Sequence, residues 1–218
     1  MKVRIKMCGT TSKQDAEAAV ELGVDALGFI FAEKSPRYVT PDFAAQLIDD
    51  VPPFISRVGV FVDDGLDQVK DIVTTVGLTQ VQLHGKESAG FCKELKKWNR
   101  SLVVCKAFLV GKESSGPDLS SYLGSIDCLL FDTYVKGMEG GTGHTFDWSA
   151  IRGLDVNLPI ILAGGLNPGN VAAAIKSTTP YAIDINSGVE ESPGIKNHEL
   201  LAQLIDNVHR TEHELTTD

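Results

Sequence analysis

Short runs of apolar and β-branched residues recur along the chain, and segments with helical spacing separate them. Eight of these runs are expected to form strands: residues 3–8, 26–31, 57–62, 80–84, 102–108, 128–132, 159–163 and 182–186. Several intervening segments place apolar residues three and four positions apart and are expected to form helices: residues 12–22, 41–50, 66–76, 88–98, 167–176 and 197–210. Strands and helices therefore alternate along the chain.

An eightfold alternation of this kind predicts parallel strands joined by crossover helices, which can close into a (β/α)8 TIM barrel of roughly 200–250 residues. The chain has 218 residues, and no linker rich in proline, glycine or serine divides it. We therefore expect an α/β fold with a single barrel domain over residues 1–210, and a frayed tail over residues 211–218.

A doubly wound open sheet is the main alternative, but the first predicted strand-to-helix turn, residues 8–12, lacks the glycines of a dinucleotide-binding turn. Two crossover segments, residues 118–123 and 148–151, are too short for full helices. The fifth and sixth crossovers are therefore the least regular part of the predicted barrel.

The charge of the chain narrows the classes of partner. The net charge is −9 with a pI near 5.0, and the basic residues are scattered, which argues against nucleic acid and against anionic membrane surfaces. Residues 1–6 alternate charged and apolar side chains, so we expect neither a signal peptide nor a membrane span. A small anionic substrate remains compatible, because a local pocket can oppose the global charge.

The cysteines and histidines give little support to a metal site. The four cysteines lie far apart and form no C-x-x-C pair, which predicts reduced thiols in a cytoplasmic protein. His209 and His213 are four residues apart, but their polar surroundings favour a solvated helix face over a metal site. We expect no metal and no cofactor.

Candidate chemistry gathers where the predicted strands end, which is the functional face of such a barrel. Asp132 closes the apolar run 128–132, and Gly140, Gly141 and Gly143 follow it. A carboxylate delivered beside a glycine-rich loop suggests acid chemistry next to a bound anion. Glycine-rich loops are also common as plain turns.

Other strand ends carry Cys8 and His84, and Arg37 lies on the loop after the second strand. Lys6 has the same strand parity as Cys8, so its ammonium could favour the thiolate. Arg37 could bind a carboxylate through two hydrogen bonds. Each residue also has a structural interpretation: a small buried thiol, a polar cap of the barrel mouth, an ion-paired lysine or ordinary surface charge.

Two further turns follow the seventh and eighth strands, Gly164-Gly165 and Asn186-Ser187-Gly188. Loops at these places in barrels commonly bind phosphate through backbone N–H groups, and glycine permits a close approach. Together with the turn at Gly141–Gly143 they predict a phosphate site. Asp184 and Asn186 could instead be hydrogen-bonding supports for that loop.

An ordered set of motifs runs from residue 3 to about residue 197. It comprises Lys6-Met7-Cys8-Gly9, Ala26-Leu27-Gly28-Phe29-Ile30-Phe31, Lys34-Ser35-Pro36-Arg37-Tyr38-Val39, Val58-Gly59-Val60-Phe61-Val62, Val81-Gln82-Leu83-His84-Gly85, Phe131-Asp132, Gly140-Gly141-Thr142-Gly143, Phe146-Asp147-Trp148, Gly164-Gly165-Leu166-Asn167-Pro168 and Ser187-Gly188-Val189-Glu190. With these motifs the chain closely resembles the phosphoribosylanthranilate isomerases of tryptophan biosynthesis.

The resemblance implies an Amadori rearrangement of a small phosphosugar, N-(5′-phosphoribosyl)anthranilate, without metal or cofactor. It implies that Asp132 is the general acid that opens the ribose ring and that Cys8 is the general base at C2′. Arg37 would bind the anthranilate carboxylate. The remaining implied substrate-binding residues are His84, Gly141, Thr142, Gly143, Gly164, Gly165, Asn186, Ser187 and Gly188.

Two other functions remain open at this point. Another phosphate-binding barrel, such as indole-3-glycerol-phosphate synthase, would be expected to carry a lysine acid and glutamates where this chain has Cys8 and Asp132. A non-catalytic phosphosugar-binding or scaffolding barrel would have no chemical reason to retain both proton-transfer residues. We expect a monomer, since no additional apolar surface helix is evident.

Overall fold

The structure, a computed structural model, describes residues 2–110, 119–132, 151 and 156–217. Eight parallel strands form a closed barrel in sequence order, with β8 returning to pair with β1. They are β1 (Arg4–Met7), β2 (Ala26–Ile30), β3 (Ser56–Phe61), β4 (Gln80–Leu83), β5 (Val103–Leu109), β6 (Cys128–Asp132), β7 (Ile160–Ala163) and β8 (Ala182–Ile185). The predicted (β/α)8 barrel is confirmed, and every predicted strand agrees with an observed one to within one residue at each end.

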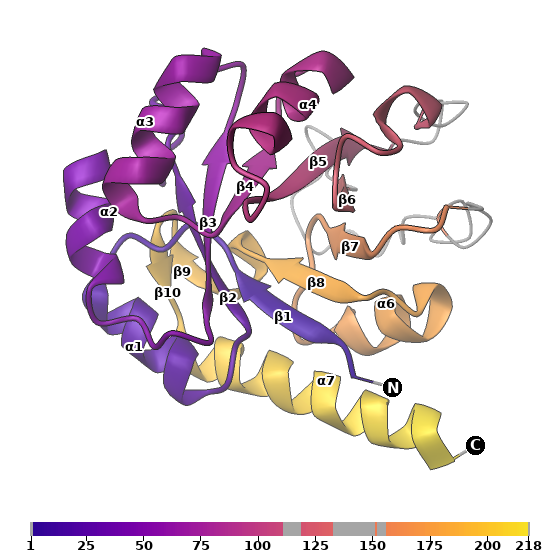
Figure 1. The fold of residues 1–218 in the computed structure, drawn as a ribbon. Helices are drawn as coiled ribbons and strands as arrows, with labels where there is room; N and C mark the ends of the chain where they lie inside the picture. The colour runs from indigo at the N-terminus through magenta and orange to yellow at the C-terminus, as the bar shows by residue number, and fades with distance from the viewer. Residues whose placement is uncertain (1, 111–118, 133–150, 152–155, 218) are drawn as a thin grey trace.

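The described helices surround the barrel on its outer side (Figure 1). They are α1 (Lys13–Glu21), α2 (Pro41–Ile48), α3 (Leu66–Val76), α4 (Ala89–Trp98), α6 (Val171–Thr178) and α7 (His198–Thr217), with short 3-10 turns η1 (Ser120–Tyr122) and η2 (Ser187–Val189). A two-stranded hairpin, β9 (Glu190–Ser192) and β10 (Ile195–Lys196), follows β8. Within the described ranges no helix is both long and apolar enough to span a membrane.

Side-chain caps start three of the helices where the sequence predicted them. The hydroxyl oxygens of Ser12, Thr40 and Ser88 accept hydrogen bonds from backbone N–H groups in the first turns of α1, α2 and α4. The fifth crossover contains only η1 among its described residues, as its short length predicted. The predicted crossover helix around residues 148–151 lies outside the described residues, apart from the buried Ile151.

The start of α6 was predicted wrongly. A helix was expected from residue 167, but α6 begins at Val171. Asn167 and Asn170 instead form a turn, because both side-chain amides donate to the carbonyl of Gly165 at 3.1 and 2.9 Å. Such local side-chain bonds compete with the helical ladder. The four residues before Val171 therefore belong to the loop after β7.

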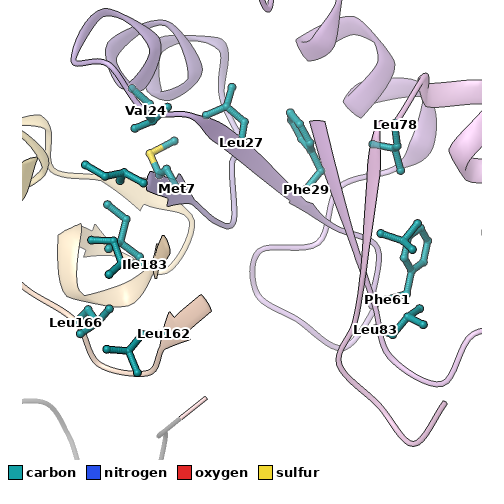
Figure 2. Packing of buried hydrophobic residues seen from close by; sticks show 14 of the residues in the cluster. Met7, Val24, Leu27, Phe29, Phe61, Leu78, Leu83, Leu162, Leu166 and Ile183 are labelled. Carbon is teal, nitrogen blue, oxygen red and sulfur yellow. The ribbon is translucent and has the colours of Figure 1, made fainter. Parts of the chain in front are cut away.

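Alternating strand positions separate the core into two layers. One set packs outward against the helices; Figure 2 shows Met7, Leu27, Phe29, Phe61 and Leu83 in this layer. The other set faces the barrel axis, and its side chains form separate clusters of mostly small residues: Cys105, Ala107, Cys128, Leu130, Ile161, Ala163 and Ala182, with Cys8, Ile30 and Val60 nearer the mouth. Small interior residues leave space for polar side chains inside the barrel.

The carboxyl-terminal helix extends further than predicted. Residues 211–217 continue α7, although a frayed tail was expected there. Thr211 is buried, Leu215 packs against the outer core, and Glu212 accepts a hydrogen bond from the backbone N–H of Val3. Lys176 on α6 forms a 2.7 Å ion pair with Glu214. These tertiary contacts hold a segment whose sequence is polar and close to the chain end.

Deleting residues 211–218 is therefore expected to lower the free energy of unfolding by about 1–3 kcal/mol, mainly through the lost burial of Leu215 and Thr211. Urea denaturation followed by circular dichroism measures the change. His213→Gln, on the exposed side of α7, serves as the control and should change this free energy by less than about 0.5 kcal/mol. A truncated chain with an unchanged unfolding midpoint would show that the tail adds no stability.

Candidate active site

The carboxyl ends of the strands bring four of the predicted residues to the mouth of the barrel. Cys8 directly follows β1, His84 follows β4, Asp132 ends β6 and Asn186 follows β8. Each lies an even number of positions from an inward-facing strand residue, so each side chain faces the barrel axis. Residues separated by up to 178 positions in sequence therefore line one opening.

A buried ion pair lies beneath Cys8. Lys6 on β1 and Asp184 on β8 are paired in register, and Nζ of Lys6 lies 2.8 Å from both carboxylate oxygens. Neither side chain is exposed by more than about a twentieth. A Cβ at Gly28 would lie 3.0 Å from Sγ of Cys8 and 3.0 Å from Nζ of Lys6. Glycine at position 28 thus leaves room for the thiol and the ammonium side by side.

The surroundings of Cys8 act on its charge in opposite directions. Burial raises the pKa of the thiol above its ordinary value, and the positive charges of Lys6 and Lys196 oppose that increase. For Lys6, burial favours the neutral amine, but Asp184 and Cys8 outweigh it and raise its pKa. Lys6 therefore stays charged and remains a source of stabilisation for a Cys8 thiolate.

Asp132 lies beside His84 across the barrel mouth. Nε2 of His84 is 3.3 Å from Oδ2 of Asp132, and Nδ1 of the same ring is 3.3 Å from Nε2 of Gln82. Gln82 is buried, and its Oε1 has no hydrogen-bond partner among the described residues. Rotating the Gln82 amide would let Oε1 accept a hydrogen bond from Nδ1–H of His84.

Arg37 is not a freely solvated surface residue. Its Nε lies 2.8 Å from Oε1 and its Nη2 2.6 Å from Oε2 of Glu190, which follows β8. Burial favours the neutral form of Glu190, but hydrogen bonds from Arg37 and Lys196 outweigh it and lower the pKa of the carboxyl group. The guanidinium is therefore held in a bidentate ion pair that only the folded barrel assembles.

The Gly164-Gly165 turn and the Gly188 turn pack backbone against backbone. Gly164 and Gly165 both have positive φ angles, of 93° and 62°. A Cβ at Gly188 would come within 1.9 Å of the carbonyl oxygen of Leu166. The loops after β7 and β8 thus meet at Gly188, where the sequence predicted a shared phosphate site. The third predicted contributor, Gly141, Thr142 and Gly143, lies outside the described residues.

Sequence reasoning missed the charged groups that support these residues. Glu190 was named only as the last residue of a motif, with no role, and it is 153 positions from its partner Arg37. Lys196 was given no role either. Lys106, in β5, and Glu87 form a buried ion pair of 3.2 Å, and Nζ of Lys106 also donates to the carbonyl of Gly85 at 2.7 Å. That contact holds the turn that follows His84. No sequence signal for such long-range pairs was available.

The histidines that sequence analysis considered for a metal are both exposed on α7. Across the part of the chain that the structure describes, no three histidine, cysteine or acidic side chains gather as potential metal ligands. The four cysteines are all buried and unbridged.

Comparisons with known proteins converge on one family. The model of the N-(5'phosphoribosyl)anthranilate (PRA) isomerase family matches residues 5–207. An N-(5'-phosphoribosyl)anthranilate isomerase from Geobacter sp. (strain M21) is 45% identical over 202 residues, which cover 93% of this chain and 96% of the relative.

Solved structures agree with the sequence comparison. The crystal structure of phosphoribosyl anthranilate isomerase from Thermotoga maritima is 39% identical with a TM-score of 0.85, covering 96% of this chain and 100% of that one. A crystal structure of phosphoribosyl anthranilate isomerase in complex with reduced 1-(o-carboxyphenylamino)-1-deoxyribulose 5-phosphate is 38% identical with a TM-score of 0.82, with the same coverage of both chains.

The backbone contact at Gly188 generates a stability prediction. Gly188→Ala places a methyl group against the Leu166 carbonyl and must separate the two loops, so it should lower the free energy of unfolding by about 1–3 kcal/mol. Gly90→Ala is the matched control: position 90 lies in α4 and has space for a Cβ, so the same change should stabilise by about 0.5–1 kcal/mol. Chemical denaturation of both variants tests the opposite signs, and a neutral Gly188→Ala would refute the close packing.

The burial of Cys8 generates a titration prediction. Because burial disfavours the charged thiolate, the thiol should lose its proton above about pH 8.5, the usual midpoint for cysteine. The difference in ultraviolet thiolate absorbance between the unmodified chain and Cys8→Ser, recorded as a function of pH, gives the midpoint. A value below that of free cysteine would mean that Lys6 and Lys196 outweigh burial.

Proposed function

The chain belongs to the N-(5'-phosphoribosyl)anthranilate isomerase family, and we propose on that basis that it isomerises N-(5'-phosphoribosyl)anthranilate to 1-(2-carboxyphenylamino)-1-deoxyribulose 5-phosphate in tryptophan biosynthesis. One observation of this structure carries the assignment of roles. Two groups able to exchange protons, Asp132 and Cys8, face the same barrel mouth from β6 and from the end of β1. The reaction needs an acid and a base acting on one sugar.

In the first step Asp132 is the general acid. Its proton passes to the ring oxygen of the ribose, the bond from that oxygen to C1′ breaks, and the nitrogen lone pair forms an iminium ion. His84 supports this role, because its Nε2 lies beside Oδ2 of Asp132 and Gln82 contacts the other ring nitrogen. The contact with His84 thus fixes the direction of the Asp132 carboxyl group.

In the second step Cys8 is the general base. The thiolate removes the proton from C2′, the electron pair of that C–H bond moves toward the iminium carbon, and the resulting enolamine tautomerises to the ketone. Burial raises the pKa of the Cys8 thiol and so disfavours the loss of its proton. The iminium ion formed in the first step brings a positive charge next to Cys8, and with Lys6 it favours the thiolate when the base is needed. The order of the two steps thus follows from the positive charge that the first step creates.

The two ends of the substrate are assigned to different loops of the mouth. We assign the anthranilate carboxylate to Arg37, on the loop after β2. We assign the phosphate to the backbone of Gly164, Gly165 and the turn from Asn186 to Gly188, completed by Gly141–Gly143. The packing of the loops after β7 and β8 supports this assignment, because it brings the turn with the positive-φ Gly164 and Gly165 close to Gly188.

The comparisons favour this reaction over the two alternatives left open by the sequence. An indole-3-glycerol-phosphate synthase would need a lysine acid at the mouth, whereas Lys6 is bound to Asp184 below it. A scaffolding barrel would not require a thiol and a carboxyl group facing one opening. In such a protein, Cys8→Ala and Asp132→Asn would have no functional effect.

The assembly and the location of the enzyme stay predictions. We expect a monomer. The phosphoribosylanthranilate isomerase of Thermotoga maritima is dimeric, and one solved structure shows monomers generated from that dimer. We also expect a cytoplasmic location, in keeping with four cysteines that are free and buried.

Cys8→Ala and Asp132→Asn are each expected to lower kcat by about 10²–10⁴, because each removes one proton-transfer group. A fluorescence assay follows the disappearance of phosphoribosylanthranilate generated in situ. Both variants should still bind the reduced product analogue, since neither loses the carboxylate or phosphate contacts. Cys92→Ala, in α4 away from the mouth, is the matched cysteine control and should keep kcat within about threefold. Near-normal turnover of Cys8→Ala or Asp132→Asn would refute the role assigned to that residue.

A further inference from the structure

Arg37 can bind a carboxylate in a defined direction only if its own direction is set. We propose that Glu190 is the positioning residue for Arg37, and that Lys196 holds the Glu190 carboxylate in place. The inference rests on the proposed function, since it assigns Arg37 to the carboxylate of the substrate. It adds a residue from the hairpin β9–β10 to the determinants of substrate recognition.

The contacts between Arg37 and Glu190 define the plane of the guanidinium. Nε of Arg37 lies 2.8 Å from Oε1 and 3.1 Å from Oε2, and Nη2 lies 2.6 Å from Oε2. Two parallel hydrogen bonds of this kind orient the fork much more strictly than a single contact. The Nη1 side of the same plane then points away from Glu190, in a direction that the ion pair determines.

Lys196 fixes the carboxylate from its other side. Its side chain is fully buried, and Nζ lies 2.9 Å from Oε1 of Glu190 and 2.9 Å from Oδ1 of Asn186. The backbone N–H of Gly194 also donates to Oε1 at 3.2 Å. Glu190 is therefore held by groups of its own hairpin, and its position does not depend on the longer and more exposed Arg37 side chain.

Gly9 brings this network next to the proposed base. Its φ angle is +70°, and a Cβ there would lie 2.8 Å from Cδ of Arg37 and 2.9 Å from Oδ1 of Asn186. The Arg37 stem thus passes directly over the residue that follows Cys8. A small shift of Glu190 would move the guanidinium relative to the reacting carbon atoms.

The charges of the network also suit an anionic ligand. Two cations, Arg37 and Lys196, share one carboxylate, Glu190, so the three side chains sum to a net charge of plus one. A carboxylate ligand would be attracted by this net positive charge. Neutralising Glu190 would leave both cations and so make the network more positive. If the affinity for the anionic substrate falls in that variant, the cause is the lost orientation of Arg37 and not the change in charge. Orientation and charge therefore predict opposite effects of Glu190→Gln.

A double-mutant cycle on Arg37 and Glu190 tests the proposal. Glu190→Gln should raise KM for phosphoribosylanthranilate about tenfold with kcat within about threefold, because the ground-state contact of Arg37 is misdirected. Arg37→Ala should raise KM at least as much. In the Arg37→Ala background, Glu190→Gln should change KM by less than about twofold, since it acts through Arg37.

A second measurement separates positioning from damage to the hairpin. Inorganic phosphate carries no carboxylate for Arg37, so its inhibition constant should change less than about twofold in Glu190→Gln. Asp127→Asn is the control for removing the carboxylate partner of a lysine. Asp127 lies 2.8 Å from Nζ of Lys96. It directly precedes β6 and therefore lies at the end of the barrel opposite the mouth. The KM of Asp127→Asn should stay at the unmodified value.

The outcomes distinguish this inference from the proposed function. Three results would overturn the positioning role alone. They are a KM effect of Glu190→Gln that persists in full in the Arg37→Ala background, a lower KM in Glu190→Gln, and a loss of phosphate inhibition as large as the KM effect. An unchanged KM in Arg37→Ala would overturn the carboxylate assignment and this inference together. The isomerase reaction itself would still be tested separately by Cys8→Ala and Asp132→Asn.

Discussion

Closure of the sheet between β1 and β8 is the constraint on which the site depends. It places Lys6 opposite Asp184 in register and joins them by two contacts of 2.8 Å inside the barrel. Removing one partner of such a pair would leave a buried charge and cost about 3–5 kcal/mol, whereas two apolar residues could replace the pair at little cost. The pair has a consequence for Cys8, because the charge of Lys6 opposes the burial that disfavours the thiolate.

The same principle applies at the rim of the barrel. The network of Arg37, Glu190 and Lys196 joins the loop after β2 to the hairpin after β8, and Asn186 extends it to the proposed phosphate loop. On the opposite side, the buried Lys106 and Glu87 pair secures the turn after β4. Buried ion pairs add little net stability, but breaking one leaves a buried charge, so they disfavour other positions of these loops. Recognition at the mouth depends on where these loops lie.

Much of the fold could be predicted because it depends on local patterns. The period of two along the strands and the capping residues of α1, α2 and α4 are properties of short segments, and the strand boundaries agreed to within one residue. The predictions differed from the structure at the start of α6 and at the end of α7. Asn167 and Asn170 form a turn instead of a first helical turn, and residues 211–217 stay helical because Leu215 and Thr211 reach the core.

The sequence by itself determined the barrel and the candidates at the strand ends, Cys8, His84 and Asp132, since a strand's parity and its last residue are local facts. Only the tertiary structure decided their neighbours. The contact of His84 with Asp132 spans 48 positions, and that of Arg37 with Glu190 spans 153. Neither partner of these pairs carries a local signal for the other. Such pairings follow from where closure of the barrel puts each loop, and the pattern of a short segment does not contain that information.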